Sequence, residues 1–197
     1  MPNIKEVKNR IGSVKSTQQL TKAMKMVAAA KLKRAQDKVT ELRPYSNRLN
    51  EILSNLSDSI SNVLFEQRDV KNKLFIVVAS DKGLCGSFNS NIFKLFNTVS
   101  ENNNDHLDSI NILPIGKKAY DFFKKKDYNV IDQFWNTLNG FSYADASNIF
   151  DYVQDEYLNN NIDKVHIIYN EFKNVAVQNS VVEQFLPVEN NLEEDNK

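Results

Sequence analysis

A heptad pattern of apolar residues runs from Ile4 to Val63 without a change of register. With Ile4 at position a, fourteen of the eighteen a and d positions are apolar. This apolar seam consists of Ile4, Val7, Ile11, Val14, Ala28, Leu32, Ala35, Val39, Leu42, Leu49, Leu53, Leu56, Ile60 and Val63. A register held for about eight heptads is typical of a coiled coil and not of a helix lying on a globular core. At about 1.5 Å per residue the helix would be about 90 Å long, so we expect an extended rod whose seam another helix covers.

Local signals mark the start of this helix and one irregularity within it. Asn3 followed by Glu6 resembles a capping box, which predicts that the helix starts at Ile4. Pro44 lacks a backbone N–H and its ring clashes with the preceding turn, so a kink or a brief break is expected near Arg43. The seam keeps its register on both sides of Pro44 and therefore continues past it.

The charge of the chain is unevenly distributed. The whole sequence has 25 Lys or Arg and 25 Asp or Glu, but residues 1–48 hold twelve basic residues and three acidic ones. Five lysines flank the seam at heptad positions e and g: Lys8, Lys15, Lys22, Lys31 and Lys38. Any one of them could simply lie on a solvated face, but the whole array favours a charged partner helix. A basic arm also indicates an acidic partner, which could be a protein, a nucleic acid or an anionic membrane surface.

Three consecutive seam positions are polar, namely Gln18, Thr21 and Lys25. Around them, residues 20–30 place apolar or small side chains on nearly every face of the helix. A helix that is apolar all round is normally enclosed by protein. The methionines here are deformable and the alanines almost featureless, so two interpretations remain: a tight helix–helix contact, or a bearing-like surface that meets changing surroundings.

The rest of the chain has the alternating strand and helix patterns of an α/β fold. Residues 73–80 form a continuous apolar run, as in a central parallel strand covered on both faces. Further strands are expected at 110–115, 129–135 and 165–172, an antiparallel edge at 175–186, and helices at 89–99, 117–126 and 143–158. We therefore predict a Rossmann-like small parallel sheet domain at residues 66–187, after a long basic coiled-coil helix at 1–65. Residues 188–197 are predicted to be an acidic disordered tail.

Motifs for catalysis or cofactor binding are sparse. The segment Ser80–Gly86 lies where a dinucleotide fold carries its phosphate loop, but it offers only G-x-x-G, so a tight strand-to-helix turn is favoured over a nucleotide site. Cys85 has no histidine in a related segment, since His106 and His166 lie elsewhere. A cysteine nucleophile and a zinc site are both disfavoured. An acidic helical face is expected to be solvated: Asp151, Asp155 and Glu156. We expect no catalytic, cofactor or metal residues.

Composition limits the cellular locations that are expected for this chain. The single cysteine excludes an internal disulfide, and no apolar run approaches the roughly 18 to 20 residues of a membrane-spanning helix. The first residues have neither the apolar region of a signal peptide nor the composition of a transit peptide. A reducing cytosol is the expected address.

Three motifs in this sequence resemble those of one family. Residues 17–31, TQQLTKAMKMVAAAK, closely resemble the signature near the start of the ATP synthase gamma chain. Arg43-Pro44-Tyr45 and the segment Ser80–Gly86 resemble two further motifs of that family, in the same order and spacing. The similarity covers residues 3–187, and three matches together are far more specific than any one.

The resemblance implies a function and a set of partners. The sheet domain would be the foot of the central stalk and the basic helix half of its shaft, in a rotor that couples proton flow through the membrane ring to conformational changes in the catalytic head. The chain itself would be non-catalytic. Its implied partners are the alpha and beta subunits, the epsilon subunit and the membrane rotor ring, with no nucleic acid and no direct membrane span. The implied location is peripheral, on the cytoplasmic face of the bacterial inner membrane.

The resemblance also implies contact residues and a missing element. Six residues fall where the family's shaft approaches the acidic loops of the catalytic subunits: Thr21, Lys22, Met24, Lys25, Met26 and Val27. Family members continue with a long C-terminal helix that pairs antiparallel with the first helix, whereas this sequence ends at Lys197 without it. We expect that helix to be a separate partner and the sequence to be a fragment, a truncated product or one piece of a split chain.

Two other functions stay open on the residues alone. A basic-arm nucleic-acid-binding α/β protein would lose affinity steeply with salt, although no base-reading motif is visible. A nucleotide-dependent Rossmann-type enzyme would bind NAD or ATP.

Overall fold

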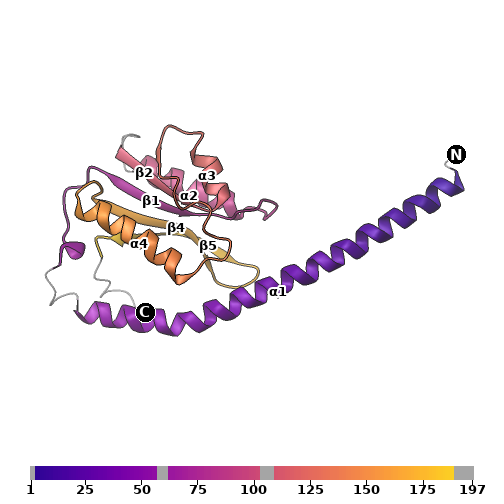
Figure 1. Cartoon of the computed structure of the whole chain (residues 1–197), viewed down its shortest axis with the longest axis horizontal. Coiled ribbons are helices and arrows are strands. Elements are labelled where there is room, and N and C mark those ends of the chain that lie inside the picture. Colours follow the sequence, from indigo (N-terminus) through magenta and orange to yellow (C-terminus); the bar gives the residue numbers. More distant parts are fainter. Residues whose placement is uncertain (1–2, 57–61, 103–108, 189–197) are drawn as a thin grey trace. The chain divides into compact units, whose positions relative to one another are not determined.

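The computed structural model describes residues 3–56, 62–102 and 109–188. The chain forms two compact units, one within residues 1–58 and the other within residues 59–197. The first is a single long helix and the second is a sheet with helices (Figure 1). The predicted fold class, an α/β domain preceded by a long N-terminal helix, is confirmed, and the pairing of that helix in a coiled coil stays a prediction.

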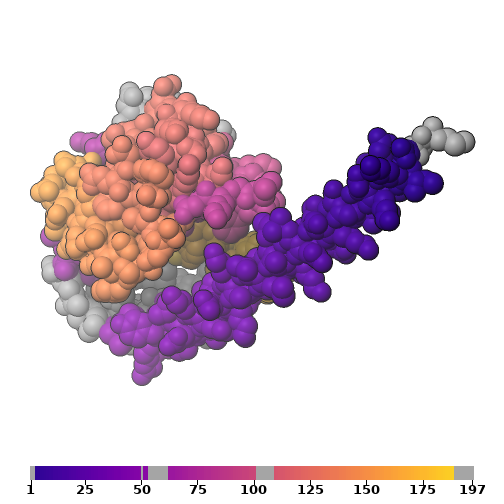
Figure 2. Space-filling view, turned by 45° about the vertical axis from the view of Figure 1, so that its right-hand side comes forward, coloured from indigo at the N-terminus to yellow at the C-terminus, as the bar shows by residue number. Residues whose placement is uncertain are grey.

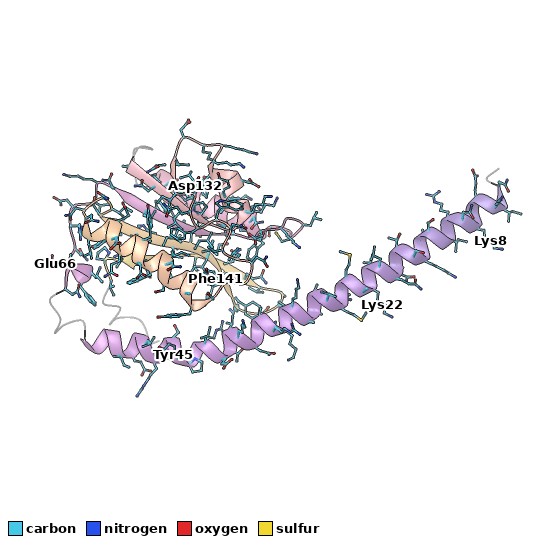
Figure 3. The ribbon with its side chains drawn as sticks, in the orientation of Figure 1. Lys8, Lys22, Tyr45, Glu66, Asp132 and Phe141 are labelled. Carbon is cyan, nitrogen blue, oxygen red and sulfur yellow. The ribbon has the colours of Figure 1, made fainter. Side chains whose placement is uncertain are left out.

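The first unit is the helix α1, which extends from Ile4 to Leu56. Its predicted start is confirmed, and the Asn3 side chain accepts a hydrogen bond from the Lys5 backbone N–H at 3.2 Å. Pro44 lies inside the helix, which remains continuous there. The ribbon bends near Tyr45 (Figure 3), so the expected irregularity is a bend and not a break.

The structure differs from the heptad prediction at the far end of the seam. Val63 is not part of α1 but begins a short 3-10 helix, η2 (Val63–Phe65). Asn62 precedes it in an extended conformation and accepts a hydrogen bond from the Leu64 N–H, which ends any helical continuity into Val63. Ile60 lies outside the described residues. The heptad pattern therefore overestimated the length of the helix, because the pattern does not take a local capping residue into account.

The second unit contains a five-stranded sheet in the order β3-β2-β1-β4-β5. The strands are β1 (Lys73–Val78), β2 (Ile110–Ile115), β3 (Asn129–Val130), β4 (Lys164–Phe172) and β5 (Gln178–Leu186). β1 to β4 pair in parallel, and β5 pairs with β4 antiparallel, as predicted for the edge. β3 is much shorter than the predicted strand 129–135, because the chain leaves the sheet after Ile131 donates a last hydrogen bond to the Ile112 carbonyl.

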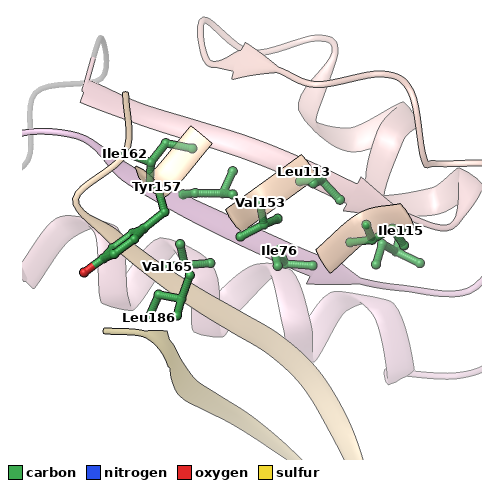
Figure 4. Close-up of a cluster of buried hydrophobic side chains, with 10 residues drawn as sticks. Ile76, Leu113, Ile115, Val153, Tyr157, Ile162, Val165 and Leu186 are labelled. Carbon is green, nitrogen blue, oxygen red and sulfur yellow. The ribbon is translucent and has the colours of Figure 1, made fainter. Parts of the chain in front are cut away.

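Helices cover both faces of this sheet. Alternate residues of β1 point to opposite sides, so Leu74 and Ile76 face one core and Phe75 and Val77 the other. The first core lies under α4 (Tyr143–Leu158), whose Val153 and Tyr157 are fully buried (Figure 4). The second lies under α2 (Phe88–Asn102) and α3 (Lys117–Phe123). Two complete cores explain why this unit is compact on its own.

The turn between β2 and α3 depends on a glycine that has no room for a side chain. Gly116 has φ +97°, and a Cβ there would lie 2.0 Å from the Ala79 carbonyl oxygen. Gly140 has φ +87° but open space around the same position, so it is a matched control. We expect Gly140→Ala to cost about 1–2 kcal/mol in unfolding free energy and Gly116→Ala about 3 kcal/mol or more, because only the second adds a backbone clash.

Urea denaturation followed by tryptophan fluorescence measures both losses, because the single tryptophan, Trp135, lies in the sheet unit. Equal losses in the two variants would contradict the close approach at Gly116.

Candidate partner-binding surface

The apolar seam of α1 lies open within this chain. Every α1 side chain whose exposure the structure describes is exposed except Gln36, which is partly buried. Seam residues from Ile4 to Leu49 share this exposure, for example Ile11 at 52%, Leu32 at 42% and Leu42 at 61%. Figure 2 shows α1, coloured indigo to purple, as a rod one helix thick. An apolar stripe of this length is the kind of surface that another polypeptide covers.

Short side chains leave a shallow open groove along one side of α1. Ser13, Thr17 and Thr21 follow one another at four-residue spacing, and longer side chains border them: Val14, Gln18, Lys22 and Lys25. Each of the three hydroxyls donates to the backbone carbonyl one turn earlier, at 3.2 Å for Ser13, 3.0 Å for Thr17 and 2.8 Å for Thr21. The groove therefore presents small side chains whose donors already have acceptors. The sequence predictions above did not include this groove, although the four-residue spacing of Ser13, Thr17 and Thr21 is present in the sequence.

The six predicted contact residues divide between the sides of the helix. Thr21, Lys22 and Lys25 line the groove. Because successive helical residues are separated by about 100°, Val27 lies on the opposite side of the helix. By the same geometry Met24 and Met26 lie on the two flanks of the groove, Met24 beside Thr21 and Met26 beside Lys22. All six are exposed, so the helix offers partner contacts around its whole circumference here and not on one face alone.

The same stretch of α1 has a one-sided charge. Between Val7 and Gln36 the helix carries eight Lys or Arg and no Asp or Glu. The flanking lysines at heptad positions e and g are all exposed. Farther along, the Lys33 ammonium pairs with the Asp37 carboxylate at 3.7 Å, where the first acid of this region occurs. A run of cations with so few acidic residues nearby attracts an acidic surface.

The segment Ser80–Gly86 forms the turn from β1 to α2. The Asn89 side chain holds it together, because its Oδ1 accepts from the Ser80 backbone N–H at 3.0 Å and its Nδ2 lies 3.2 Å from the Cys85 sulfur. Leu84 has φ +61° and a fully exposed side chain. Asp81 accepts a hydrogen bond from the Lys117 N–H and so fixes the start of α3. The predicted strand-to-helix turn is present.

The other chemically reactive residues do not form a site together. Cys85 lies in this turn, whereas His166 lies on β4 and stacks on Phe75 at 5.2 Å between ring centroids. His106 lies outside the described residues. Within residues 3–56, 62–102 and 109–188, no group of three or more His, Cys, Asp or Glu is placed to hold a metal ion.

The acidic face of α4 has ordinary structural surroundings. Asp151 and Asp155 are exposed, and the Glu156 carboxylate accepts a hydrogen bond from the Asn161 side chain at 3.0 Å. At the start of the same helix, hydrogen bonds from Ser142 lower the pKa of Asp145 as part of a capping box. Asp151 and Asp155 are therefore solvated, and Asp145 caps the start of the helix.

The described part of the chain has no helix that is both long and apolar enough for a bilayer crossing.

Comparison with known proteins identifies the family. The ATP synthase family model matches residues 3–197. The ATP synthase gamma chain of Chloroherpeton thalassium is 45% identical over 197 residues, and that of Cytophaga hutchinsonii is 45% identical over 195 residues. Each match covers 95% of this chain but only 64% and 66% of the respective relative, so the chain spans about two thirds of their length.

Solved structures agree with this match. A central stalk and c-ring structure of Tetrahymena thermophila mitochondrial ATP synthase contains a chain with TM-score 0.57 and 26% identity, covering 85% of this chain and 72% of that one. A rotor structure of Euglena gracilis mitochondrial ATP synthase, at TM-score 0.59 and 19% identity, shares the fold over 90% of this chain and 60% of that one. The exposed basic helix, the small parallel sheet and these matches agree, and the chain belongs to the ATP synthase gamma chain family.

Proposed function

We propose that this chain acts as a rotor subunit of the central stalk of a proton-translocating ATP synthase. In this role it couples proton flow through the membrane ring to conformational changes in the catalytic head and carries no catalytic residue itself. The observation that carries the proposal is the long, basic α1 with its uncovered apolar seam, in a member of the gamma chain family. A long stiff helix can transmit rotation.

The seam is the surface on which the second helix of the shaft packs. The matched relatives are longer than this chain, and we assign the covering helix to their C-terminal third. The regular heptad register favours knobs-into-holes packing against an antiparallel helix. In functional terms, α1 is the helix of the shaft and the sheet unit that begins at residue 59 is the foot.

The stretch from Thr21 to Val27 is the part of the shaft that meets the alpha and beta subunits. Lys22 and Lys25 supply positive charge toward acidic loops, and Met24, Met26 and Val27 supply deformable or small apolar contacts. Because the hydroxyl of Thr21 already donates to its own helix, its one proton is not free to bond a fixed partner group. This combination suits a surface whose neighbours change during rotation.

The foot is the part that joins the epsilon subunit and the membrane ring. We place the assembly at the cytoplasmic face of the bacterial inner membrane, with this chain held peripherally. Its family membership and its similarity to a central stalk structure support a role in a membrane-associated complex, and its bacterial relatives favour the bacterial membrane.

Substitution of one seam residue tests the covering helix. Leu32→Gln places an amide in the interface, whereas Lys33→Gln changes the adjacent position, which faces away from the seam. With the C-terminal third of the Chloroherpeton thalassium gamma chain as the ligand, we expect Leu32→Gln to weaken binding about ten- to a hundredfold, because it removes a buried leucine. Lys33→Gln should bind like the wild type. Titration calorimetry measures both, and equal affinities for all three chains would contradict the proposed seam.

Two lysines test the contact with the catalytic head. Lys22→Gln combined with Lys25→Gln should weaken binding to a purified alpha–beta head about two- to tenfold at low salt, and less at physiological salt, because exposed charges are screened. Lys94→Gln on the exposed side of α2 is the control. Surface plasmon resonance at two salt concentrations measures the effect. Tight binding to duplex DNA instead of the head would favour the nucleic-acid alternative.

Methionine oxidation tests whether the head encloses this stretch. Met24 is 64% exposed and Met26 61% exposed, and they lie on different sides of the helix. In the free chain, dilute peroxide should oxidise both at similar rates, because accessibility governs sulfoxide formation. In the complex with the head both should be protected, as peptide mass spectrometry would show. Protection of only one methionine would indicate a one-sided contact instead of an enclosed shaft.

A further inference from the structure

The segment of residues 62–72, here called the anchor segment, precedes β1 within the sheet unit. It has little regular structure apart from η2, yet it is fastened to the sheet unit at several points. Figure 3 labels Glu66 on this segment. Its contacts involve α4, the turn before β4 and the end of β5, which are three separate parts of the foot.

Arg68 fastens the middle of the anchor segment to the end of α4. Its guanidinium carbon lies 4.0 Å from the centre of the Tyr157 ring, and Nη1 donates to the Tyr157 carbonyl at 3.1 Å and to the Asn160 side-chain oxygen at 2.7 Å. A cation is favoured at this position because the last carbonyls of a helix carry partial negative charge. One side chain therefore combines a ring contact with two charge-assisted hydrogen bonds.

Tyr157 makes a second link in the opposite direction. Its ring is fully buried in the α4 core (Figure 4). Its hydroxyl donates to the Glu66 carbonyl at 3.3 Å. Burial raises the pKa of this hydroxyl even though Arg68 is close, so it remains a donor. Arg68 thus bonds from the anchor segment to α4, and Tyr157 bonds from α4 to the anchor segment.

Asp163 holds the C-terminal end of the anchor segment. This buried carboxylate accepts hydrogen bonds from the Lys71 and Asn72 backbone N–H groups, both at 2.9 Å. In return the Asp163 N–H donates to the Asn72 carbonyl at 2.9 Å. A buried carboxylate with two backbone donors fixes the position of the chain just before it enters β1.

The N-terminal end of the anchor segment is tied to the chain leaving β5. The Val188 N–H donates to the Leu64 carbonyl at 2.8 Å, and Leu64 and Val188 both pack against the α4 core. The start of the anchor segment and the residues just after β5 are therefore joined directly.

A rotating shaft loads the chain segment that connects it to the foot. A free segment would yield by rotation about its φ and ψ angles, since these are the soft torsions of a backbone. The anchor segment is hydrogen-bonded at several points to three elements of the foot. Rotation about a backbone torsion within it would therefore break at least one of these hydrogen bonds. Charge-assisted hydrogen bonds such as those of Arg68 and Asp163 are among the stronger contacts available for this purpose.

We infer that residues 62–72 are a mechanical coupling between shaft and foot, in which Arg68 is the positioning residue that locks the segment onto α4. The coupling role rests on the proposed rotor function, whereas the anchoring itself is a property of the foot.

Hydrogen exchange in the whole chain tests the anchoring. We expect Arg68→Ala to speed amide exchange about ten- to a hundredfold at Glu66, Lys71, Asn72 and Val188, while Ile76 of β1 keeps its wild-type rate. Arg68→Lys should restore part of the protection, because it keeps the charge but not the planar contact. Val153→Ala, which weakens the α4 core away from Arg68, is the control and should speed exchange across the foot. Unchanged exchange in Arg68→Ala, or the uniform pattern of Val153→Ala, would overturn the anchoring.

Proton pumping by the complex purified with this chain tests the coupling. With Arg68→Ala, ATP hydrolysis should continue while ATP-driven pumping per ATP hydrolysed falls severalfold, and Val153→Ala should leave that ratio at the wild-type value. A wild-type ratio in the Arg68→Ala complex would overturn the coupling role alone. A wild-type chain that enters no such complex would overturn the rotor function and the coupling role together, while the exchange result would still decide the anchoring.

Discussion

Exposure of the apolar seam of α1 to water carries an unfavourable free energy. Burying apolar surface is favourable by roughly 25 cal/mol per Å², and α1 has no layer of its own chain to bury it against within the unit that it forms. The foot, in contrast, satisfies its apolar side chains in two internal cores. The molecule therefore combines a domain that has its own apolar cores with a helix whose described apolar side chains are exposed.

Much of this organisation was predictable from the sequence because it depends on local patterns. The period of 3.5 residues identified α1, the continuous apolar run at residues 73–80 identified the central strand, and alternation of strands with helices identified the α/β unit. The start of α1 at Ile4 and the bend near Pro44 followed from the capping and proline signals. Three motifs were sufficient to suggest the family, which the full-length match to its model established.

The errors and omissions arose where distant residues or local capping decide the structure. The helix does not reach Val63, because Asn62 caps η2 instead of continuing the heptads. Arg68 gave no signal in the sequence, since its partners Tyr157 and Asn160 lie about ninety residues further along. Asp163 was equally inconspicuous, as a lone acid before a strand. The candidate surface on α1 was easier to identify because all its residues lie on one continuous element.

The bond between Leu64 and Val188 brings the first and the last described residues of the sheet unit close together. Domains whose two ends lie close together tolerate circular permutation. The sheet unit therefore has the end geometry that permutation requires.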